Sequence, residues 1–251
     1  MSCEFEGPRT AIVTGGAKRI GAALCRALAE DGWHLLIHCL NSRAEAEALA
    51  RELGQAAVVS ADLASPSCAD EIFGALEGLP PARLLVNNAS RFSFDSADEF
   101  TAEEWDTHFG INLRAPALLS QAFARGSEGG LIVNLLDAKL SQPNADFFTY
   151  TISKMGLAGL TELTARAYAS RAIRVCGIAP SVTLVSGPQA RENFERVHRL
   201  NALERGVEVS QIVAALRFLI ATPTITGQII TLDAGQRFLG LARDVQFLEP
   251  Q

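Results

Sequence analysis

The sequence lacks the features that mark nucleic-acid-binding, membrane and secreted proteins. Its formal net charge is −6, which gives no basic surface for nucleic acid, so we expect no such partner. No uninterrupted apolar run comes near the ~20 residues needed to cross a bilayer, so we expect no membrane insertion. The acidic start, MSCEFEGPRTAIVTGG, has no signal-peptide core, which favours a cytoplasmic location.

Clustered metal ligands and closely spaced cysteines are missing too. The five cysteines are scattered and never spaced C-x-x-C, and we interpret them as buried thiols in a reducing compartment. The four histidines form no H-E-x-x-H motif, so we predict no metal site. There is no linker, repeat or low-complexity tract. We therefore predict a single domain over 1–251, with a tail at 1–8.

The sequence instead alternates short apolar runs with longer helical patterns. The runs are nearly continuous in hydrophobicity, which is typical of parallel strands covered on both faces. They lie at 10–15, 34–39, 56–61, 83–89, 130–136, 173–179 and 228–233. Helical patterns fill 20–32, 42–54, 105–124 and 149–169. This alternation predicts an α/β fold, a doubly wound parallel sheet of Rossmann type with helices on both faces.

The first strand leads directly into a glycine-rich turn, TGGAKRIG at 14–21, and then into a helix. Such a turn lets the main chain approach a pyrophosphate, while the helix start offers free N–H groups and a positive dipole end. We predict a dinucleotide site here, and a plain glycine-rich turn is the alternative. The residues assigned to it are Gly15, Lys18, Arg19, Ile20 and Gly21.

The end of the second strand indicates which dinucleotide is preferred. An NAD site usually places an acidic residue there to hold the ribose diol. The sequence HCLNSR, 38–43, has no carboxylate before Glu45. Ser42 and Arg43 suit a 2′-phosphate instead, because the guanidinium can form charge-assisted hydrogen bonds to it. We predict NADP(H) rather than NAD(H).

A tyrosine and a lysine stand one helical turn apart at Tyr150 and Lys154. A phenol is a weak acid at neutral pH, and an ammonium on the same helix face is expected to lower the pKa of Tyr150. Such a pair can pass a proton while hydride moves to or from a nicotinamide. A chance pair on a helix surface is the alternative.

Together these residues resemble the short-chain dehydrogenase/reductase family over nearly the whole chain. Arg19 stands where the family loop usually has a glycine, and Tyr150 and Lys154 match its catalytic pair. The resemblance implies that Asn112 joins the proton relay by holding a water that links Lys154 to solvent. It also implies further cofactor contacts, at Asp62, Leu63, Asn88, Ala89, Ser90, Tyr150, Lys154 and Pro180.

Three features resemble the pteridine reductase branch of that family. Arg19 follows the loop lysine, Phe92 comes two residues after N-N-A-S, and Asp137 replaces the usual active-site serine. The resemblance implies a catalytic set of Asp137, Tyr150, Lys154 and Asn112. The implied substrate contacts are Arg19, Ser90, Phe92, Asp137 and Tyr150.

Asp137 is the residue that bears most on the substrate. A serine hydroxyl can steady a ketone oxygen, whereas an ionised carboxylate repels a developing alkoxide. A carboxyl group suits a substrate with N–H donors and a C=N bond that must gain a proton, such as a reduced pterin. An aspartate that only caps the loop after the fifth strand is the alternative. Similarly, Phe92 could pack in the core rather than stack on a substrate.

The function predicted is an NADPH-dependent reductase of a pterin-like C=N bond, converting a dihydropteridine to a tetrahydropteridine. A short-chain reductase or dehydrogenase of another carbonyl or imine, and a non-catalytic NADP(H)-binding sensor, remain alternatives. Residues 180–207, with Gly187-Pro188 inside, are predicted to form a substrate lid. The apolar helices at 105–124 and 149–169 exceed what one sheet can cover, and the resemblance implies a homotetramer.

Overall fold

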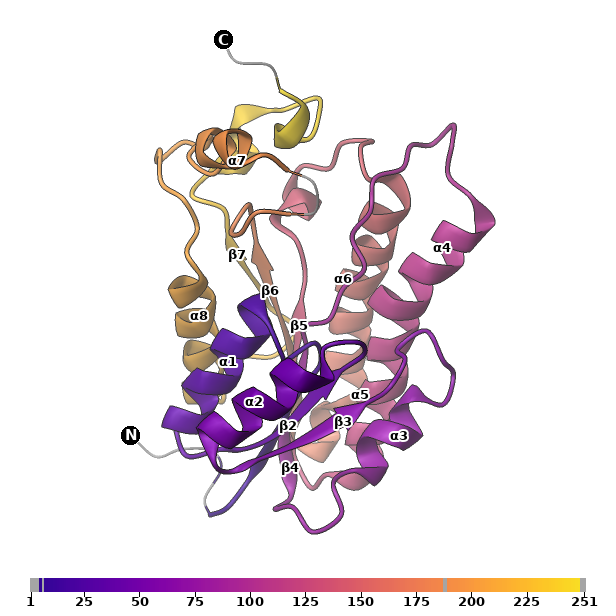
Figure 1. Cartoon of the computed structure of the whole chain (residues 1–251), viewed down its shortest axis with the longest axis vertical. Helices are drawn as coiled ribbons and strands as arrows, with labels where there is room; N and C mark the ends of the chain where they lie inside the picture. The colour runs from indigo at the N-terminus through magenta and orange to yellow at the C-terminus, as the bar shows by residue number, and fades with distance from the viewer. Residues whose placement is uncertain (1–4, 6, 187–188, 249–251) are drawn as a thin grey trace.

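The computed structural model describes residues 5, 7–186 and 189–248 (Figure 1). A seven-stranded parallel sheet has the order β3-β2-β1-β4-β5-β6-β7. The strands are β1 (Thr10–Val13), β2 (His34–Cys39), β3 (Ala56–Ser60), β4 (Ala82–Asn87), β5 (Gly130–Leu135), β6 (Ile173–Pro180) and β7 (Ile229–Leu232). The order reverses between β1 and β4, where parallel sheets of this kind bind ligands.

Helices cover both faces of the sheet. One face carries α1 (Arg19–Glu30), α2 (Arg43–Leu53) and α8 (Val209–Ala221). The other carries α3 (Cys68–Gly74), α4 (Ala102–Phe109), α5 (Ala115–Gly126) and α6 (Phe148–Tyr168). The short helix α7 (Arg191–Val197) lies beyond the carboxyl ends of the strands, beside the C-terminal segment. No helix in the described part of the chain has the length and apolar character needed to span a membrane.

Successive strand residues point to opposite faces, and this divides the core into two layers. In β1, Ala11 and Val13 join the cluster under α1 and α8, whereas Ile12 joins the cluster under α3, α5 and α6. All three side chains are fully buried. Because both faces of the sheet are covered, apolar residues are favoured at successive strand positions, which explains the nearly continuous hydrophobicity of the strands.

The predicted fold class is confirmed, and the seven strands lie where the apolar runs are. One helix prediction was wrong: 105–124 is interrupted by a π-helical turn, Gly110–Arg114, between α4 and α5. Pro116 has no N–H to donate to the carbonyl of Asn112 four residues earlier, so a regular α-helix cannot run through this point. The short helices α3 and α7 were not predicted.

Candidate active site

The glycine-rich turn is tied to the end of β4 by side-chain hydrogen bonds. Thr14 Oγ1 accepts from the N–H groups of Asn88, at 2.9 Å, and Ala89, at 3.0 Å. Asn88 Nδ2 donates to the Thr14 carbonyl at 2.8 Å. A Cβ on Gly21 would lie 2.1 Å from the Gly15 carbonyl oxygen, so only glycine fits at that position. These contacts hold the start of α1 against the carboxyl end of β4.

Arg19 stands where the family usually has a glycine, and its φ is +54°, in the left-handed region that favours glycine. Its guanidinium donates to the Val185 carbonyl at 2.7 Å. The phosphate loop is therefore bonded to the segment that follows β6. Arg19 and Ile20 also line a cavity at the carboxyl ends of β4, β5 and β6.

His38 supports the same loop, and sequence reasoning missed it. Its Nδ1 accepts from the Gly15 N–H at 3.2 Å, and its Nε2 lies 3.0 Å from the Ala61 carbonyl. Burial lowers the pKa of His38, which favours the neutral ring with its proton on Nε2. A buried histidine at the end of a strand has no short motif, so only the fold reveals this role.

The residues predicted to hold a 2′-phosphate surround the end of β2. Ser42 precedes the first residue of α2, and Arg43 is exposed and bonded to Glu47 at 2.8 Å. Lys18 forms an ion pair with Glu45 at 2.7 Å. Asp62 and Leu63 follow β3, the neighbouring strand, and the Asp62 carboxylate accepts from the Ala64 N–H at 2.8 Å. The loops at the ends of β1 and β2 thus present two cationic side chains and a hydroxyl group, from Lys18, Arg43 and Ser42.

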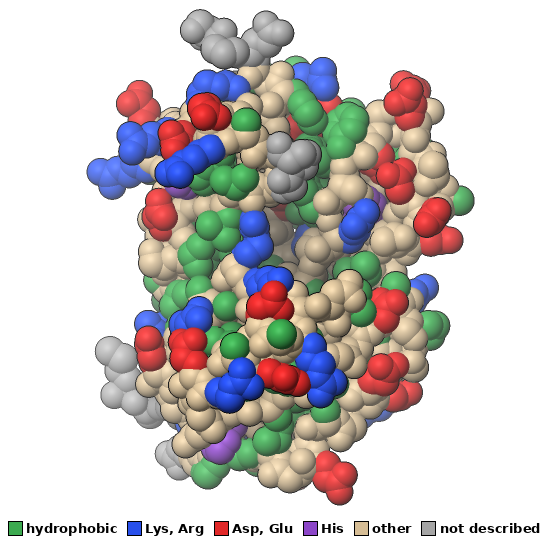
Figure 2. Space-filling view, in the orientation of Figure 1, with side chains coloured by type: hydrophobic (Ala, Val, Ile, Leu, Met, Phe, Trp, Pro, Cys, Tyr) green, Lys and Arg blue, Asp and Glu red, His purple; other side chains and the backbone are tan. Residues whose placement is uncertain are grey.

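A cavity of about 340 Å³ opens at the carboxyl ends of β4, β5 and β6. Figure 2 shows it as a hollow with Lys and Arg side chains around its rim. The predicted site residues that line it are Arg19, Ile20, Asn88, Ser90, Phe92, Asp137, Tyr150, Lys154 and Pro180. The remaining predicted residues do not line this cavity. These are Gly15, Lys18, Gly21, Ser42, Arg43, Asp62, Leu63, Ala89 and Asn112.

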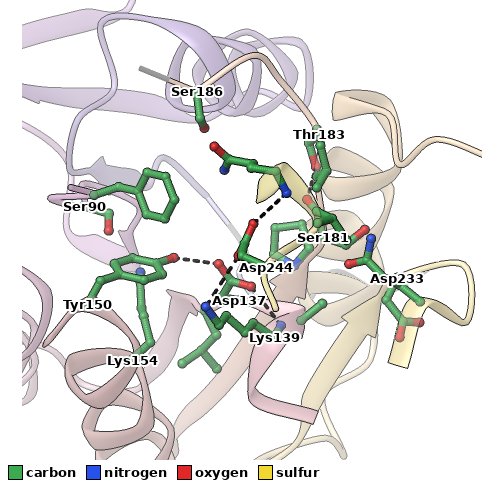
Figure 3. Close-up of a pocket in the computed structure, with 18 of the residues that line it drawn as sticks. Ser90, Asp137, Lys139, Tyr150, Lys154, Ser181, Thr183, Ser186, Asp233 and Asp244 are labelled. Carbon is green, nitrogen blue, oxygen red and sulfur yellow. Dashed lines mark hydrogen bonds and ion pairs between the residues drawn. The ribbon is translucent and has the colours of Figure 1, made fainter. Parts of the chain in front are cut away.

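Asp137 and Tyr150 are joined directly. The Tyr150 hydroxyl donates to Asp137 Oδ2 at 2.7 Å, as Figure 3 shows. Asp137 Oδ1 accepts from the Lys139 N–H at 2.8 Å and so caps the 3₁₀ turn Ala138–Ser141. One carboxylate oxygen caps a turn while the other holds the phenol. The capping role that the sequence left open for Asp137 is thus present, and its part in substrate binding and proton transfer stays a prediction.

The pKa of Tyr150 shifts in the opposite direction to the one expected from its neighbour Lys154. Burial raises the pKa of Tyr150 well above its usual value, and the charge and hydrogen bond of Asp137 raise it further. The expectation that Lys154 makes Tyr150 more acidic is wrong in this structure, because burial and the Asp137 carboxylate dominate. Tyr150 is thus a protonated hydroxyl that points at a carboxylate.

Lys154 lies one turn further along α6 and is buried. Its ammonium donates to the Leu135 carbonyl at 2.7 Å and lies 5.8 Å from the centre of the Tyr150 ring. Burial lowers the pKa of Lys154 to about 8, and the charge of Asp137 opposes this shift. The ammonium therefore titrates much closer to neutrality than an exposed lysine does.

Asn112 is placed in the π-helical turn, and its side chain is fully used by protein. Its Oδ1 accepts from the Arg91 N–H at 2.8 Å and the Ser90 hydroxyl at 3.1 Å. Its Nδ2 donates to the Arg91 carbonyl and to Ser153 Oγ, both at 3.0 Å. The side chain thereby fixes the loop after β4 against α6. Its place in a proton relay stays a prediction.

Phe92 both packs and faces the cavity. It stacks on Phe147 at 4.3 Å between ring centres and meets Tyr150 edge-on at 4.8 Å. It is nevertheless 37% exposed and lines the cavity. A flat ring held from behind by another ring forms a rigid wall for a planar ligand.

The C-terminal end of the chain contributes to this cavity, which sequence reasoning missed. The lining includes Arg243, Asp244, Val245 and Gln246, together with Lys139 from the turn after β5. Of the predicted lid, the residues from Ser181 to Leu184, Ser186 and Gln189 line the cavity, while Gly187-Pro188 lie outside the described residues. Among the described residues no group of three His, Cys, Asp or Glu side chains is arranged to hold a metal ion.

Comparison with known proteins decides the family. A model of the short chain dehydrogenase family matches residues 9–196, which is most of the chain. The chain belongs to the short-chain dehydrogenase family. It is thus an oxidoreductase, and the resemblance seen in the sequence is confirmed.

Individual relatives agree with this family. The crystal structure of FolM alternative dihydrofolate reductase 1 from Brucella canis, complexed with NADP, is 38% identical with a TM-score of 0.88, covering 92% of this chain and 94% of that one. Pteridine reductase 1 of Leishmania tarentolae is 29% identical over 90% of this chain and 95% of its own length. L-xylulose reductase of Bos taurus is 31% identical, over 90% and 96% respectively. The NADP in the Brucella structure agrees with the cofactor predicted here.

Proposed function

We propose that this short-chain dehydrogenase uses NADPH to reduce the C=N bond of a dihydropteridine, giving a tetrahydropteridine. The observation that carries the proposal is the hydrogen bond between the Tyr150 hydroxyl and the Asp137 carboxylate at the floor of the cavity. Similarity to FolM alternative dihydrofolate reductase 1 and to pteridine reductase 1 supports the same substrate class.

The preference for NADP(H) is supported by residues at the end of β2. Arg43, Ser42 and Lys18 surround the position where a 2′-phosphate would lie, and no acidic residue ends the strand. Glu45 and Glu47 pair with Lys18 and Arg43, so these cations are held in place at the loop. A phosphate would compete for these exposed pairs, which are worth little on their own.

The site residues would deliver a proton while NADPH supplies the hydride. Reduction of a C=N bond places hydride on the carbon and a proton on the neighbouring nitrogen. Because its pKa is raised, Tyr150 holds its proton at neutral pH and can donate it to that nitrogen. The Asp137 carboxylate then accepts hydrogen bonds from substrate N–H groups, and the Lys154 ammonium offsets the charge left on the phenolate.

A ketone is a poorer fit to the same geometry. Hydride addition to a carbonyl builds negative charge on oxygen beside the Tyr150 hydroxyl, where the Asp137 carboxylate would repel it. Ser141, the nearby hydroxyl, lies in the 3₁₀ turn and is exposed. It does not line the described cavity and so offers no substitute for the usual active-site serine.

The family resemblance also supports a homotetramer in the cytoplasm as part of this proposal. On α6, Met155 and Leu163 are 42% and 67% exposed, although both are apolar. Pairing of this helix with a second copy would cover them. Such exposed apolar positions on a long helix are typical of subunit interfaces.

The test is a substrate panel with the purified wild-type protein. We expect NADPH, followed at the nicotinamide absorbance band, to be oxidised with 7,8-dihydrobiopterin and much more slowly with simple ketones or L-xylulose. NADH should be a weaker donor than NADPH. Turnover of ketones without any turnover of dihydropterins would assign the same scaffold to carbonyl reduction, and NADPH binding without any turnover would favour a sensor.

A further inference from the structure

The C-terminal segment, residues 240–248, forms a wall of the catalytic cavity although it lies far from Tyr150 in the sequence. Figure 1 shows it beyond the carboxyl ends of the strands, next to α7. Its residues Arg243 to Gln246 face the same space as Asp137 and Tyr150. These residues are therefore placed to contact a substrate bound in the cavity.

Contacts on both sides fix the position of the segment. Asp146, in the loop before α6, accepts from the Arg243 guanidinium at 2.8 Å and from the Asp244 N–H at 2.7 Å. Asn193 of α7 donates to the Gln246 carbonyl at 3.1 Å. Phe247 stacks on Phe147, which also backs Phe92, at 5.7 Å between ring centres. Asp244 is therefore held at a defined place in the wall.

The Asp244 carboxylate lies beside the reaction centre and is incompletely neutralised. Its Oδ1 accepts from the Gln246 N–H at 3.1 Å, and its Oδ2 is 3.4 Å from the Lys139 ammonium, a long contact. Figure 3 shows it next to Asp137. Burial raises the pKa of Asp244, the Lys139 charge lowers it and the Asp137 charge raises it. The carboxylates of Asp137 and Asp244 thus share this part of the cavity, with the Lys139 ammonium beside Asp244 and the Lys154 ammonium near Asp137.

The rest of the wall is built of neutral hydrogen-bonding groups and paired charges. Besides Asn88 at the end of β4, five amide side chains line the cavity, and they are Gln142, Asn144, Gln189, Gln236 and Gln246. The described cations on this side of the cavity each form an ion pair with a carboxylate. These cations are Lys139, Arg237 and Arg243. Arg19, predicted to contact both cofactor and substrate, donates to the Val185 carbonyl, and the Lys154 ammonium donates to the Leu135 carbonyl. Amides hydrogen-bond well to hydroxyls, whereas an anionic group beside Asp244 meets cations that are already paired with carboxylates.

The chemistry of the proposed reaction places a substituent at this wall. In a 7,8-dihydropteridine, the carbon that receives hydride carries the side chain, and its neighbouring nitrogen receives the proton. A side chain on that carbon therefore starts next to Tyr150 and Asp137, where Asp244 lies. A carboxylate there can accept a hydrogen bond from a hydroxyl, but it repels a second negative charge.

We propose that Asp244 is a specificity-determining residue. It accepts a hydrogen bond from a neutral hydroxylated substituent beside the reducible bond and disfavours substrates whose substituent is anionic. The inference rests on the proposed reduction of dihydropteridines. It adds that Asp244 selects among dihydropteridines by the charge of their substituent.

The experiment compares two substrates that share the ring and differ in the charge of the side chain. One is 7,8-dihydrobiopterin, with a neutral dihydroxypropyl group, and the other is 6-carboxy-7,8-dihydropterin, whose anionic carboxylate is attached to the same ring carbon. The ratio of their kcat/KM values is measured for the wild type and for Asp244→Asn, which keeps the acceptor for the Gln246 N–H. We expect the ratio to move about tenfold toward the 6-carboxy substrate, a modest effect for one partly buried charge a few ångströms away.

Two further variants sharpen the test. Asp70→Asn, an exposed position on α3, makes the same change in net charge away from the cavity and should leave the ratio unchanged. Lys139→Met removes the cation beside Asp244 and should move the ratio the opposite way, toward dihydrobiopterin. It also keeps the inference testable if Asp244→Asn is poorly folded.

The outcomes separate the inference from the proposed function. If the wild type reduces both pterins and neither cavity variant changes the ratio, while NADPH affinity is retained, Asp244 does not select substrates. If the wild type reduces neither pterin, the proposed function fails, and the inference about Asp244 fails with it.

Discussion

At the scale of single residues, burial rather than motif membership decides how the groups of the site titrate. Tyr150 and Lys154 are both buried beside Asp137, and their pKa values move in opposite directions. The hydroxyl keeps its proton over the neutral range, whereas the ammonium loses its proton near pH 8. The pH dependence of the site therefore follows Lys154.

This assignment predicts the alkaline limb of the pH profile. Below pH 8 Lys154 is charged, and above it the neutral amine can no longer offset charge on Tyr150 or hold an anionic transition state. We expect kcat/KM for the dihydropterin to fall about tenfold per pH unit above a pKa of about 8. Lys154→Arg, whose charge persists, should be less active but flat over this range. A wild-type profile that stays level to pH 10 would contradict the assignment.

Gly21 gives a second residue-scale prediction. A Cβ there would meet the Gly15 carbonyl at 2.1 Å, so Gly21→Ala must push the phosphate loop out of place. We expect NADPH affinity to fall at least tenfold and stability to drop by about 1–3 kcal/mol, measured by calorimetric titration and thermal unfolding. Gly74→Ala, in α3 with open space around its Cβ, is the matched control and should leave NADPH affinity unchanged without lowering stability. Equal effects of the two substitutions would refute the steric argument.

At the scale of elements, α6, the helix that carries Tyr150 and Lys154, begins in an unusual way. Phe147, just before α6, has a φ of +53° and makes no side-chain cap. The buried Asp95 takes over this role. Its carboxylate accepts from the Thr149 N–H at 3.0 Å and from the Thr149 hydroxyl, which also lies 2.7 Å from His108 Nδ1. Tyr150 is the next residue, so this cap positions the phenol.

Removing the cap should therefore affect both stability and catalysis. We expect Asp95→Ala to destabilise the protein by about 2 kcal/mol, lowering Tm by about 5 °C, because a buried N–H and hydroxyl lose their acceptor. The kcat should fall while NADPH affinity changes little. Asp98→Ala, an exposed position three residues later, serves as the control in the same loop. Unchanged Tm and kcat in Asp95→Ala would show that α6 is positioned by packing alone.

The strands and helices also show which parts of the fold could be predicted from the sequence and which could not. The strands were predictable because both faces of the sheet are covered and most of their positions are apolar. The break at Pro116 was foreseeable from its missing N–H, but helical periodicity continues through it and hides it. The contact of Asp95 with Thr149 joins residues 54 positions apart, and Asp244 meets Lys139 across 105 positions. Neither pair has a spacing or motif, so only the folded chain reveals them.

At the scale of the whole molecule, the proposed tetramer gives a prediction about mass. We expect light scattering to give four times the 26.8 kDa chain mass for the wild type. Leu163→Glu, at the most exposed large apolar position of α6, should yield smaller species because a charge cannot be buried at a helix pair. Leu40→Glu, an exposed position at the end of β2, should keep the wild-type mass. A monomeric wild type would contradict the proposed assembly.

The whole site depends on one arrangement, in which a carboxylate takes the place of a neutral hydroxyl and is bonded to the catalytic phenol. The most direct test is the rate of NADPH oxidation with 7,8-dihydrobiopterin by wild type and by Asp137→Ser, with NADPH binding measured in parallel. We predict that the wild type reduces the pterin and that the variant loses at least a hundredfold in kcat while binding NADPH normally. Equal pterin reduction by Asp137→Ser would contradict the account, because the carboxylate would then have no part in the chemistry.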